Sequence, residues 1–382
     1  MDHGFPSRDT VRFRHGSRNV ASPAKSAGSA PSTEGARGAV MTVRLVTTLF
    51  ALGALLNGVG CGGSEPGEAS TDTLTLGAYT TPREAYAELL PGFVARWRER
   101  TGRTIEVRES YLGSGAQARA IVGGFEADVA ALSLAPDVDT LREANLVTHD
   151  YTNDAFGGMV TRSIVVIGVR EGNPKNIRDW ADLAREDVEV LTPNVRTSGG
   201  AMWNVLALYG AAMRGHAGVP ANDREAAVGF VASVLRRVKI MDRGARDSML
   251  TFERGVGDAI ITYENEIAAA RAKGERYDVV IPRSTVRIDN PIAVVDAYAT
   301  RHRANESARA LIEFLREPQA QRVFARHGFR PVLDSVAAEV EASFPRVEDL
   351  FTVQDLGGWD AVRRDVFADG AAYDRALERG RR

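Results

Sequence analysis

The segment that decides the fold runs from residue 74 to residue 134 and reads LTLGAYTTPREAYAELLPGFVARWRERTGRTIEVRESYLGSGAQARAIVGGFEADVAALSL. Short β-rich runs at 74–78, 104–107 and 128–134 alternate in it with helical patterns at 83–101 and 116–123. Strands that alternate with helices indicate an α/β fold with largely parallel sheets.

A second alternation of the same kind follows in the middle of the chain. Runs rich in β-branched residues at 163–169 and 278–281 enclose strand patterns at 188–191, 237–241 and 258–263 and a helix at 201–213. The pattern predicts two α/β lobes joined by two crossing strands. Lobe I would comprise 74–164 and 279–382, and lobe II would comprise 165–278. Because ligands of open α/β sheets bind at the carboxyl ends of strands, we expect the site in the cleft between the lobes.

Composition limits the classes of partner. The 382 residues are 44% hydrophobic, which is enough to bury a substantial core, and 48 basic against 50 acidic residues give a net charge of -2. Because no basic excess would attract phosphate backbones, we expect no nucleic-acid partner.

The amino terminus carries the pattern of an export signal. Residues 1–40 are rich in Ser, Arg, Gly and Ala and are interpreted as an over-extended gene start or a disordered leader, with Met41 as the true start. The apolar run at 45–60 is too short to span a bilayer, so 41–61 is interpreted as a lipoprotein signal peptide and 62–73 as a flexible linker. Cys61, the only cysteine of the chain, would be acylated, although Gly58 stands where a lipobox usually has leucine. The alternative is an ordinary signal cleavage site.

Two strand-to-helix junctions, at 110–117 and 192–201, could hold an anion. Each places a serine, Ser114 or Ser198, beside glycines at the start of a helix. Glycine lets the backbone approach a ligand closely, and the first N–H groups of a helix lie unpaired at the positive end of its dipole. Such an end binds oxyanions without a cationic side chain. Ordinary N-caps are the alternative for both serines, but one such loop in each lobe favours an anion held between them.

The chain resembles a known family from about Leu74 to Leu377. The motifs that carry the resemblance are YLGSGAQA (111–118), EADV (126–129), GNPK (172–175), DWADL (179–183), TSGGAMWN (197–204), GAR (244–246), GVGD (255–258), ENE (264–266), GFRP (328–331) and GGW (357–359). Single motifs are weak, but their order and spacing resemble the periplasmic sulfate- and thiosulfate-binding proteins of bacterial ABC importers.

The resemblance implies a two-lobed type II periplasmic binding protein fold that holds dehydrated sulfate with neutral donors. Carried over by motif, these donors are the backbone N–H groups of Ser114, Gly199, Gly200 and Ala245 and the hydroxyl of Ser198. It further implies a periplasmic monomer without enzymatic activity or cofactor, which would deliver sulfate or thiosulfate to permease subunits and touch the membrane only through its lipid anchor.

Two positions depart from the family pattern. Thr80 stands where the family usually has an aspartate in the first loop that faces the ligand, and Tyr263 stands where many members have a tryptophan that donates to the anion. A donor-only site satisfies sulfate but leaves a buried donor unpaired against hydrogen phosphate, at a cost of about 1–3 kcal/mol. A tyrosine hydroxyl can accept as well as donate, so Tyr263 would tolerate a protonated oxyanion.

The sequence fits other functions less well. Gly113-Ser114-Gly115 and Ala118 fit a dinucleotide-binding G-x-G-x-x-A, with Asp137 at about the right distance, but no catalytic acid, base or second cofactor motif accompanies it. Neither Ser114 nor Ser198 lies in a G-x-S-x-G hydrolase motif, and the six histidines show no metal spacing. Among binding proteins, thiosulfate, phosphate, molybdate or another oxyanion remains an alternative ligand.

Overall fold

The computed structural model describes residues 71–381, so Cys61 and the expected leader, signal peptide and most of the linker lie outside the described residues. The strands are β1 (Thr71–Tyr79), β2 (Thr104–Leu112), β3 (Val129–Ala131), β4 (Met159–Arg170), β5 (Val190–Leu191), β6 (Val238–Ile240), β7 (Ala259–Tyr263), β8 (Tyr277–Val280), β9 (Ser284–Val294) and β10 (Asp349–Phe351).

The α-helices are α1 (Arg83–Thr101), α2 (Ser114–Val122), α3 (Ala135–Glu143), α4 (Gly199–Met213), α5 (Arg224–Leu235), α6 (Ala245–Glu253), α7 (Glu264–Ala272), α8 (Asp296–Arg301), α9 (Asn305–Leu315), α10 (Pro318–Arg326), α11 (Asp334–Glu339), α12 (Gly358–Val362) and α13 (Ala372–Gly380). Shorter helical turns are found at Trp180–Ala184, Glu341–Ser343, Gln354–Leu356 and Arg363–Phe367.

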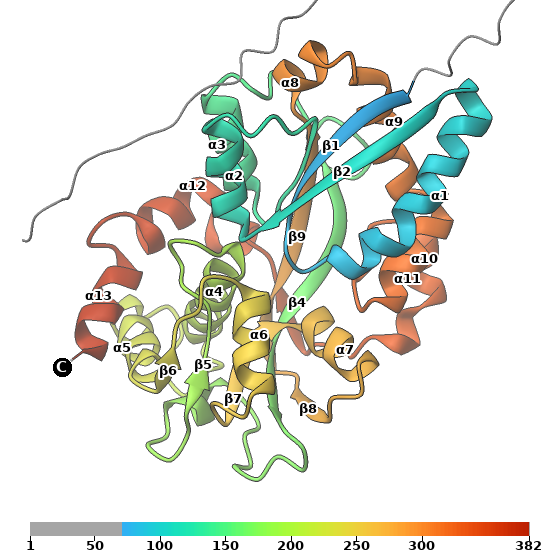
Figure 1. Ribbon diagram of the computed structural model, residues 1–382. Helices are drawn as coiled ribbons and strands as arrows, with labels where there is room; N and C mark the ends of the chain where they lie inside the picture. Colours follow the sequence, from blue (N-terminus) through green and yellow to red (C-terminus); the bar gives the residue numbers. More distant parts are fainter. Residues whose placement is uncertain (1–70, 382) are drawn as a thin grey trace, which may run out of the picture. The chain divides into compact units, whose positions relative to one another are not determined.

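The first group of strands lies in the order β2-β1-β3-β9, with β1 parallel to β2 and β3, and β9 antiparallel to β3. Leu74 and Leu76 of β1 pack with Phe93 and Trp97 of α1 and with residues of α9 and α10. Residues of β3 that point the other way, such as Ala130, pack with residues of α2, α3 and α8. The alternation of side chains along a strand therefore buries both faces of this sheet under helices. Figure 1 shows α1, α9 and α10 on one side of it and α2 and α3 on the other.

The second group lies in the order β4-β7-β5-β6, with β8 also paired to β4. Val165 and Ile167 of β4 pack in a core with α4 and α5, whereas Ile164 and Val166 pack against α6 and α7. This sheet too is covered on both faces.

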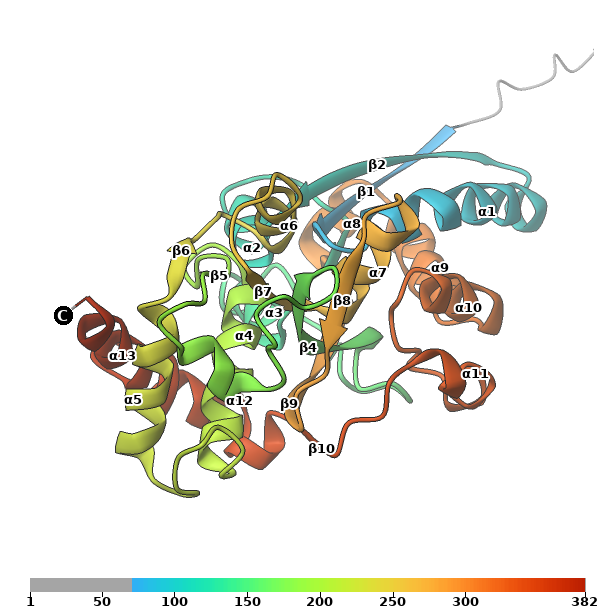
Figure 2. The same cartoon turned by 90° about the horizontal axis from the view of Figure 1, so that it is seen from below.

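Strands β4 and β9 connect the two groups, because they pair with each other in antiparallel register from Ile164 and Arg287 to Met159 and Pro291. Figure 2 shows this pair between the two sets of helices. The predicted α/β fold of two lobes with two crossover strands is therefore confirmed. One crossing strand was assigned wrongly, since 278–281 falls in β8, which pairs with β4, and the crossing is made by β9. Arg287, Asp289, Asn290 and Pro291 interrupt the apolar pattern of β9, which is why hydrophobicity alone did not reveal it.

The C-terminal helices α12 and α13 pack beside α4 and α5. Val362 and Tyr373 share a hydrophobic core with Trp203 and with residues of α5, and Trp203 makes an edge-on contact with Trp359 at 5.2 Å between ring centres. Figure 1 shows α13 beside α5. Within residues 71–381, no helix is long and apolar enough to cross a membrane.

Candidate functional site

The helices α2, α4 and α6 begin where three loops meet. Gly113, which precedes α2, lies so close to the loop before α4 that a Cβ on it would be 2.5 Å from the carbonyl oxygen of Thr197. The same Cβ would be 3.5 Å from the carbonyl oxygen of Arg243, in the loop before α6. The first residues of the three helices, Ser114, Gly199 and Ala245, are therefore brought together, as the motifs predict.

The two glycines of α4 allow the closest approaches at this junction. A Cβ on Gly199 would lie 2.8 Å from Oγ of Ser133, and one on Gly200 would lie 3.0 Å from Cε2 of Tyr263. The position of the latter Cβ is also 3.3 Å from Cβ of Ala245 and 3.3 Å from Oγ of Ser198. Real Cβ atoms do not tolerate contacts under 3 Å, so Gly199 is needed for its lack of a side chain.

The amide groups at these helix starts are buried but unpaired. Within residues 71–381, the N–H groups of Ser114, Gly199, Gly200 and Ala245 donate to no protein acceptor, although all four residues are buried. More than nine in ten buried amides of folded proteins have a partner, so four unpaired amides at one junction indicate a place for an external acceptor. All four lie at the positive ends of helix dipoles, which favour an anion there.

The two serine hydroxyls differ in what they do. Oγ of Ser114 donates to Asp137 at 2.5 Å and accepts from the N–H of Ser133 at 2.8 Å, so this hydroxyl holds the loops together. Oγ of Ser198 caps α4 by accepting from the N–H of Ala201 at 3.4 Å, and its own proton stays available for a ligand.

Thr80 lies at the end of β1, beside the same junction. It lines a cavity of about 620 Å³ with Gly113, Thr197 and Arg246. The hydroxyl of its neighbour Thr81 is buried without a hydrogen-bond partner within the described residues. The first strand-to-helix loop therefore faces the region where the three helices begin.

Tyr263 ends β7 beside α4, and its hydroxyl lies 2.6 Å from Oγ of Ser133. Burial raises the pKa of Tyr263 well above its ordinary value, so the phenol keeps its proton. Ser133 was missed by sequence reasoning. It carries the signal used for the other loops, because it follows strand β3 and comes two residues before α3, but no glycine stands beside it.

Charged side chains near the junction neutralise one another. Arg246, which follows Ala245, pairs with Glu84 of α1 at 2.9 Å and with Glu266 of α7 at 3.3 Å, and Lys273 pairs with Glu84 at 3.2 Å. Glu266 is fully buried, and this burial raises the pKa of its carboxyl to about 7. Arg246 is thus bound to carboxylates, and the donors at the junction itself are neutral groups.

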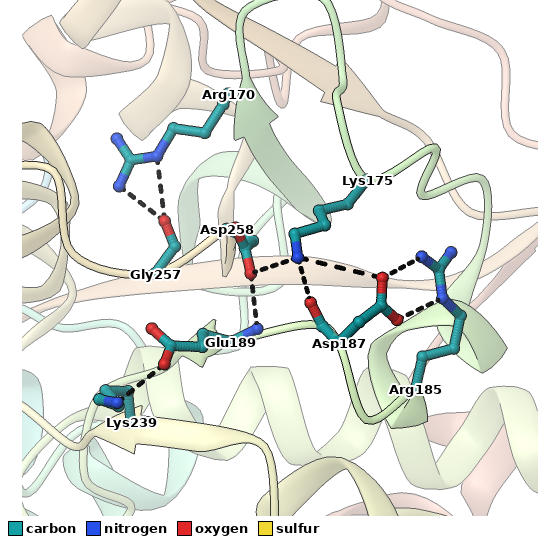
Figure 3. A network of polar contacts seen from close by, with 8 residues as sticks. All are labelled: Arg170, Lys175, Arg185, Asp187, Glu189, Lys239, Gly257 and Asp258. Carbon is teal, nitrogen blue, oxygen red and sulfur yellow. Dashed lines mark hydrogen bonds and ion pairs between the residues drawn. The ribbon is translucent and has the colours of Figure 1, made fainter.

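The far end of α6 is anchored by Arg170 of β4. Its guanidinium donates to the carbonyl oxygens of Phe252, Val256 and Gly257 at 2.7 to 3.0 Å, as Figure 3 shows for Gly257. Close to it, Lys175 lies 3.8 Å from Asp258, whose carboxylate accepts from the N–H of Glu189 at 2.9 Å. The motif at 255–258 therefore accepts from Arg170 just after α6, and its Asp258 pairs with Lys175 of the motif at 172–175.

The residues that fit a dinucleotide-binding motif make other contacts in this fold. The dinucleotide pattern at 113–118 packs against the carbonyl oxygen of Thr197, and Asp137 binds Ser114 instead of facing a cofactor groove. The part of the chain from 71 to 381 contains no group of three His, Cys, Asp or Glu side chains that could hold a metal ion.

Comparison with known proteins identifies the family of the chain. The family model described as "Bacterial extracellular solute-binding protein" matches residues 74–330. The chain belongs to this family. The sulfate-binding protein of Synechococcus elongatus is 37% identical over 340 residues, which cover 87% of this chain and 96% of that protein. The thiosulfate-binding protein of Escherichia coli K12 is 33% identical, over 82% of this chain and 94% of that protein.

A solved structure is similar to the chain in both sequence and fold. The sulfate-binding protein SubI from Mycobacterium tuberculosis H37Rv superposes with a TM-score of 0.71 at 38% identity, over 78% of this chain and 99% of that chain. The fold is therefore that of the type II periplasmic binding proteins.

Proposed function

We propose that this chain captures dehydrated sulfate at the start of α2, α4 and α6 and delivers it to the permease of an ABC importer. The observation that carries the proposal is the set of four buried, unpaired amides at Ser114, Gly199, Gly200 and Ala245. The hydroxyls of Ser198 and Tyr263 add two further donors. The loop that contains Thr80 faces the same region. The names of the similar proteins, which bind sulfate or thiosulfate, support an oxyanion of this class.

The donors explain why the ligand needs no cationic side chain. Two negative charges in a buried site are stabilised by oriented peptide dipoles, while the guanidinium of Arg246 is bound by Glu84 and Glu266. Sulfate carries no proton at neutral pH and so offers an acceptor to every donor. Thiosulfate, phosphate and molybdate are the alternatives.

Calorimetric titration of the protein with sulfate, thiosulfate, phosphate and molybdate tests the proposal. We expect the tightest binding for sulfate. Failure of every oxyanion to bind would exclude an oxyanion site at this junction.

The proposal includes export and tethering. The apolar run before Cys61 supports a protein that acts in the periplasm and is attached to the membrane through a lipid on Cys61. Mass spectrometry of the protein purified from membranes should find an acylated Cys61 as the first residue. An N-terminus beyond residue 61, or a free thiol, would contradict the anchor.

The lobes would close on the anion about β4 and β9. We place lobe I at about 74–164 and lobe II at about 165–278, and the packing of α13 on α5 supports adding the residues after Asp349 to lobe II. The ligand would then lie between α2 of one lobe and α4 and α6 of the other.

A further inference from the structure

Two buried hydroxyl groups stand beside the unpaired amides of α4. Ser133 and Tyr263 are each 1% exposed, and their oxygens are 2.6 Å apart. Ser133 Oγ would be 2.8 Å from a Cβ on Gly199, and the ring of Tyr263 would be 3.0 Å from one on Gly200. The hydroxyl pair therefore forms part of the wall of the proposed anion site.

The hydrogen bond between the two hydroxyls can run in either direction. Each hydroxyl has one proton to donate and lone pairs that accept, and within residues 71–381 neither oxygen has another partner. When Ser133 donates, Tyr263 keeps its own proton for a ligand. When Tyr263 donates to Ser133, its oxygen can accept from a ligand instead, and the proton of Ser133 is then donated to another oxygen of the same ligand. Both states are reached by rotation of the two O–H bonds, so no proton needs to leave its oxygen.

We propose that this reversible pair lets the site bind singly protonated tetrahedral dianions, such as hydrogen phosphate, as well as sulfate. The inference rests on the proposed function, since it concerns the same site. Sulfate is met by the state in which Tyr263 donates. Hydrogen phosphate presents one O–H group, which is met by the state in which Tyr263 accepts. The site is therefore not restricted to donors.

The hydroxyl of Ser133 allows the second state, because it accepts the hydrogen bond from Tyr263. Without its hydroxyl, a Tyr263 that accepts from hydrogen phosphate has no acceptor for its own buried proton. An unpaired buried donor weakens binding by roughly 5- to 150-fold. Sulfate does not need this state, because Tyr263 can donate to it directly. Removal of the Ser133 hydroxyl should therefore weaken the binding of phosphate and leave the binding of sulfate nearly unchanged.

The test is calorimetric titration of the full chain with sulfate, selenate and inorganic phosphate under mildly alkaline conditions, where phosphate carries one proton and two charges. The wild-type protein should bind all three anions. Ser133→Ala should keep its sulfate and selenate affinities within about threefold and weaken phosphate binding by roughly 5- to 150-fold. The matched control is Ser233→Ala, which removes a hydroxyl that donates to the carbonyl oxygen of Phe230 in α5, and it should change none of the affinities.

Three results would overturn the inference. The first is a wild-type protein that binds sulfate and selenate but not phosphate. The second is an equal loss of all three anions in Ser133→Ala, which would indicate a structural role. The third is unchanged phosphate affinity in Tyr263→Phe, which lacks the hydroxyl that accepts. A wild-type protein that binds none of the anions contradicts the proposed function itself, so the two failures are distinguishable.

Discussion

At the scale of single residues, Gly199 sets how closely the two sides of the site approach. Its missing side chain leaves room for Ser133, whose Oγ would be 2.8 Å from a Cβ at this position. The same closeness holds the first amide of α4 against the wall formed by Ser133 and Tyr263. The geometry of the donors therefore depends on the absence of one methyl group.

Gly199→Val should weaken sulfate binding by more than about 100-fold while leaving the fold largely intact, because overpacking of this kind costs only about 1–3 kcal/mol of stability. The measurements are calorimetry for affinity and circular dichroism for the fold. The control is Gly229→Val in α5, where a Cβ meets nothing within 4 Å. Unchanged affinity in Gly199→Val would refute the placement of the site.

Glu266 makes stability depend on pH. Burial raises the pKa of its carboxyl from 4.5 to about 7 in the folded protein, with Arg246 acting in the opposite direction. A raised pKa means that the folded state binds the proton more tightly, so this stabilisation is complete below pH 4.5 and is lost as the pH rises through about 7.

The Glu266→Gln variant lacks the carboxyl that titrates. The free energy of unfolding of the wild type, relative to that of this variant, should fall by about 3 kcal/mol as the pH rises across the window between the two pKa values. Urea denaturation of both proteins at several pH values measures the difference. A difference that stays constant over the window would show that Glu266 keeps the same charge throughout.

At the scale of elements, α6 joins the candidate site to an anchor at its far end. Its first amide lies at the junction of the three helices. The guanidinium of Arg170 binds the carbonyl oxygen of Phe252 in its last turn and those of Val256 and Gly257 just after it. Arg170 also lies over the ring of Phe252, at 3.7 Å from the ring centre. Because the helix is short, a shift at its C-terminal end would be carried to Ala245.

Arg170→Met should lower the free energy of unfolding by about 2–4 kcal/mol, because it leaves several carbonyl groups without their donor. Sulfate affinity should fall as well, since α6 is no longer held in position. Arg185→Met is the matched control from the same region, where Arg185 pairs with exposed Asp187, and it should cost less than about 1 kcal/mol. Equal effects of the two substitutions on urea denaturation would contradict the anchoring role.

At the scale of the whole molecule, ion pairs join elements that the proposal assigns to different lobes. Glu84 of α1 contacts both Arg246 of α6 and Lys273 of α7, and Arg363 donates to Asp139 of α3 at 2.6 Å. Such pairs can form only when the lobes lie against each other. They would therefore favour the closed arrangement once an anion satisfies the amides between the lobes.

Saturating sulfate should reduce the radius of gyration of the protein measured by small-angle scattering. The physical reason is that the anion binds donors from both lobes and so binds the closed arrangement more tightly. Gly199→Val, which should not bind, provides the control and should show no change on addition of sulfate. A wild-type protein whose scattering is the same with and without bound sulfate would argue against closure.

The sequence predicted the elements that local pattern controls. The helix at 83–101 was placed at its observed bounds, and the ends of the strands at 163–169 and 258–263 fell within four residues of those of β4 and β7. Apolar periodicity, β-branched runs and glycines at helix starts are local properties, so they can be read from neighbouring residues. The same reasoning located the loops at 110–117 and 192–201, and the family motifs added Ala245, Tyr263 and Thr80.

What the sequence by itself determined is thus the α/β class, the two lobes and the strand-to-helix loops that the structure brings together. Only the tertiary structure identified β9 as the crossing strand, placed Ser133 against Tyr263 and packed α13 on α5. These features join residues that are far apart in the chain, with Ser133 and Tyr263 separated by 130 positions. Contacts of this kind depend on how the sheets and helices pack, and no pattern among neighbouring residues encodes them.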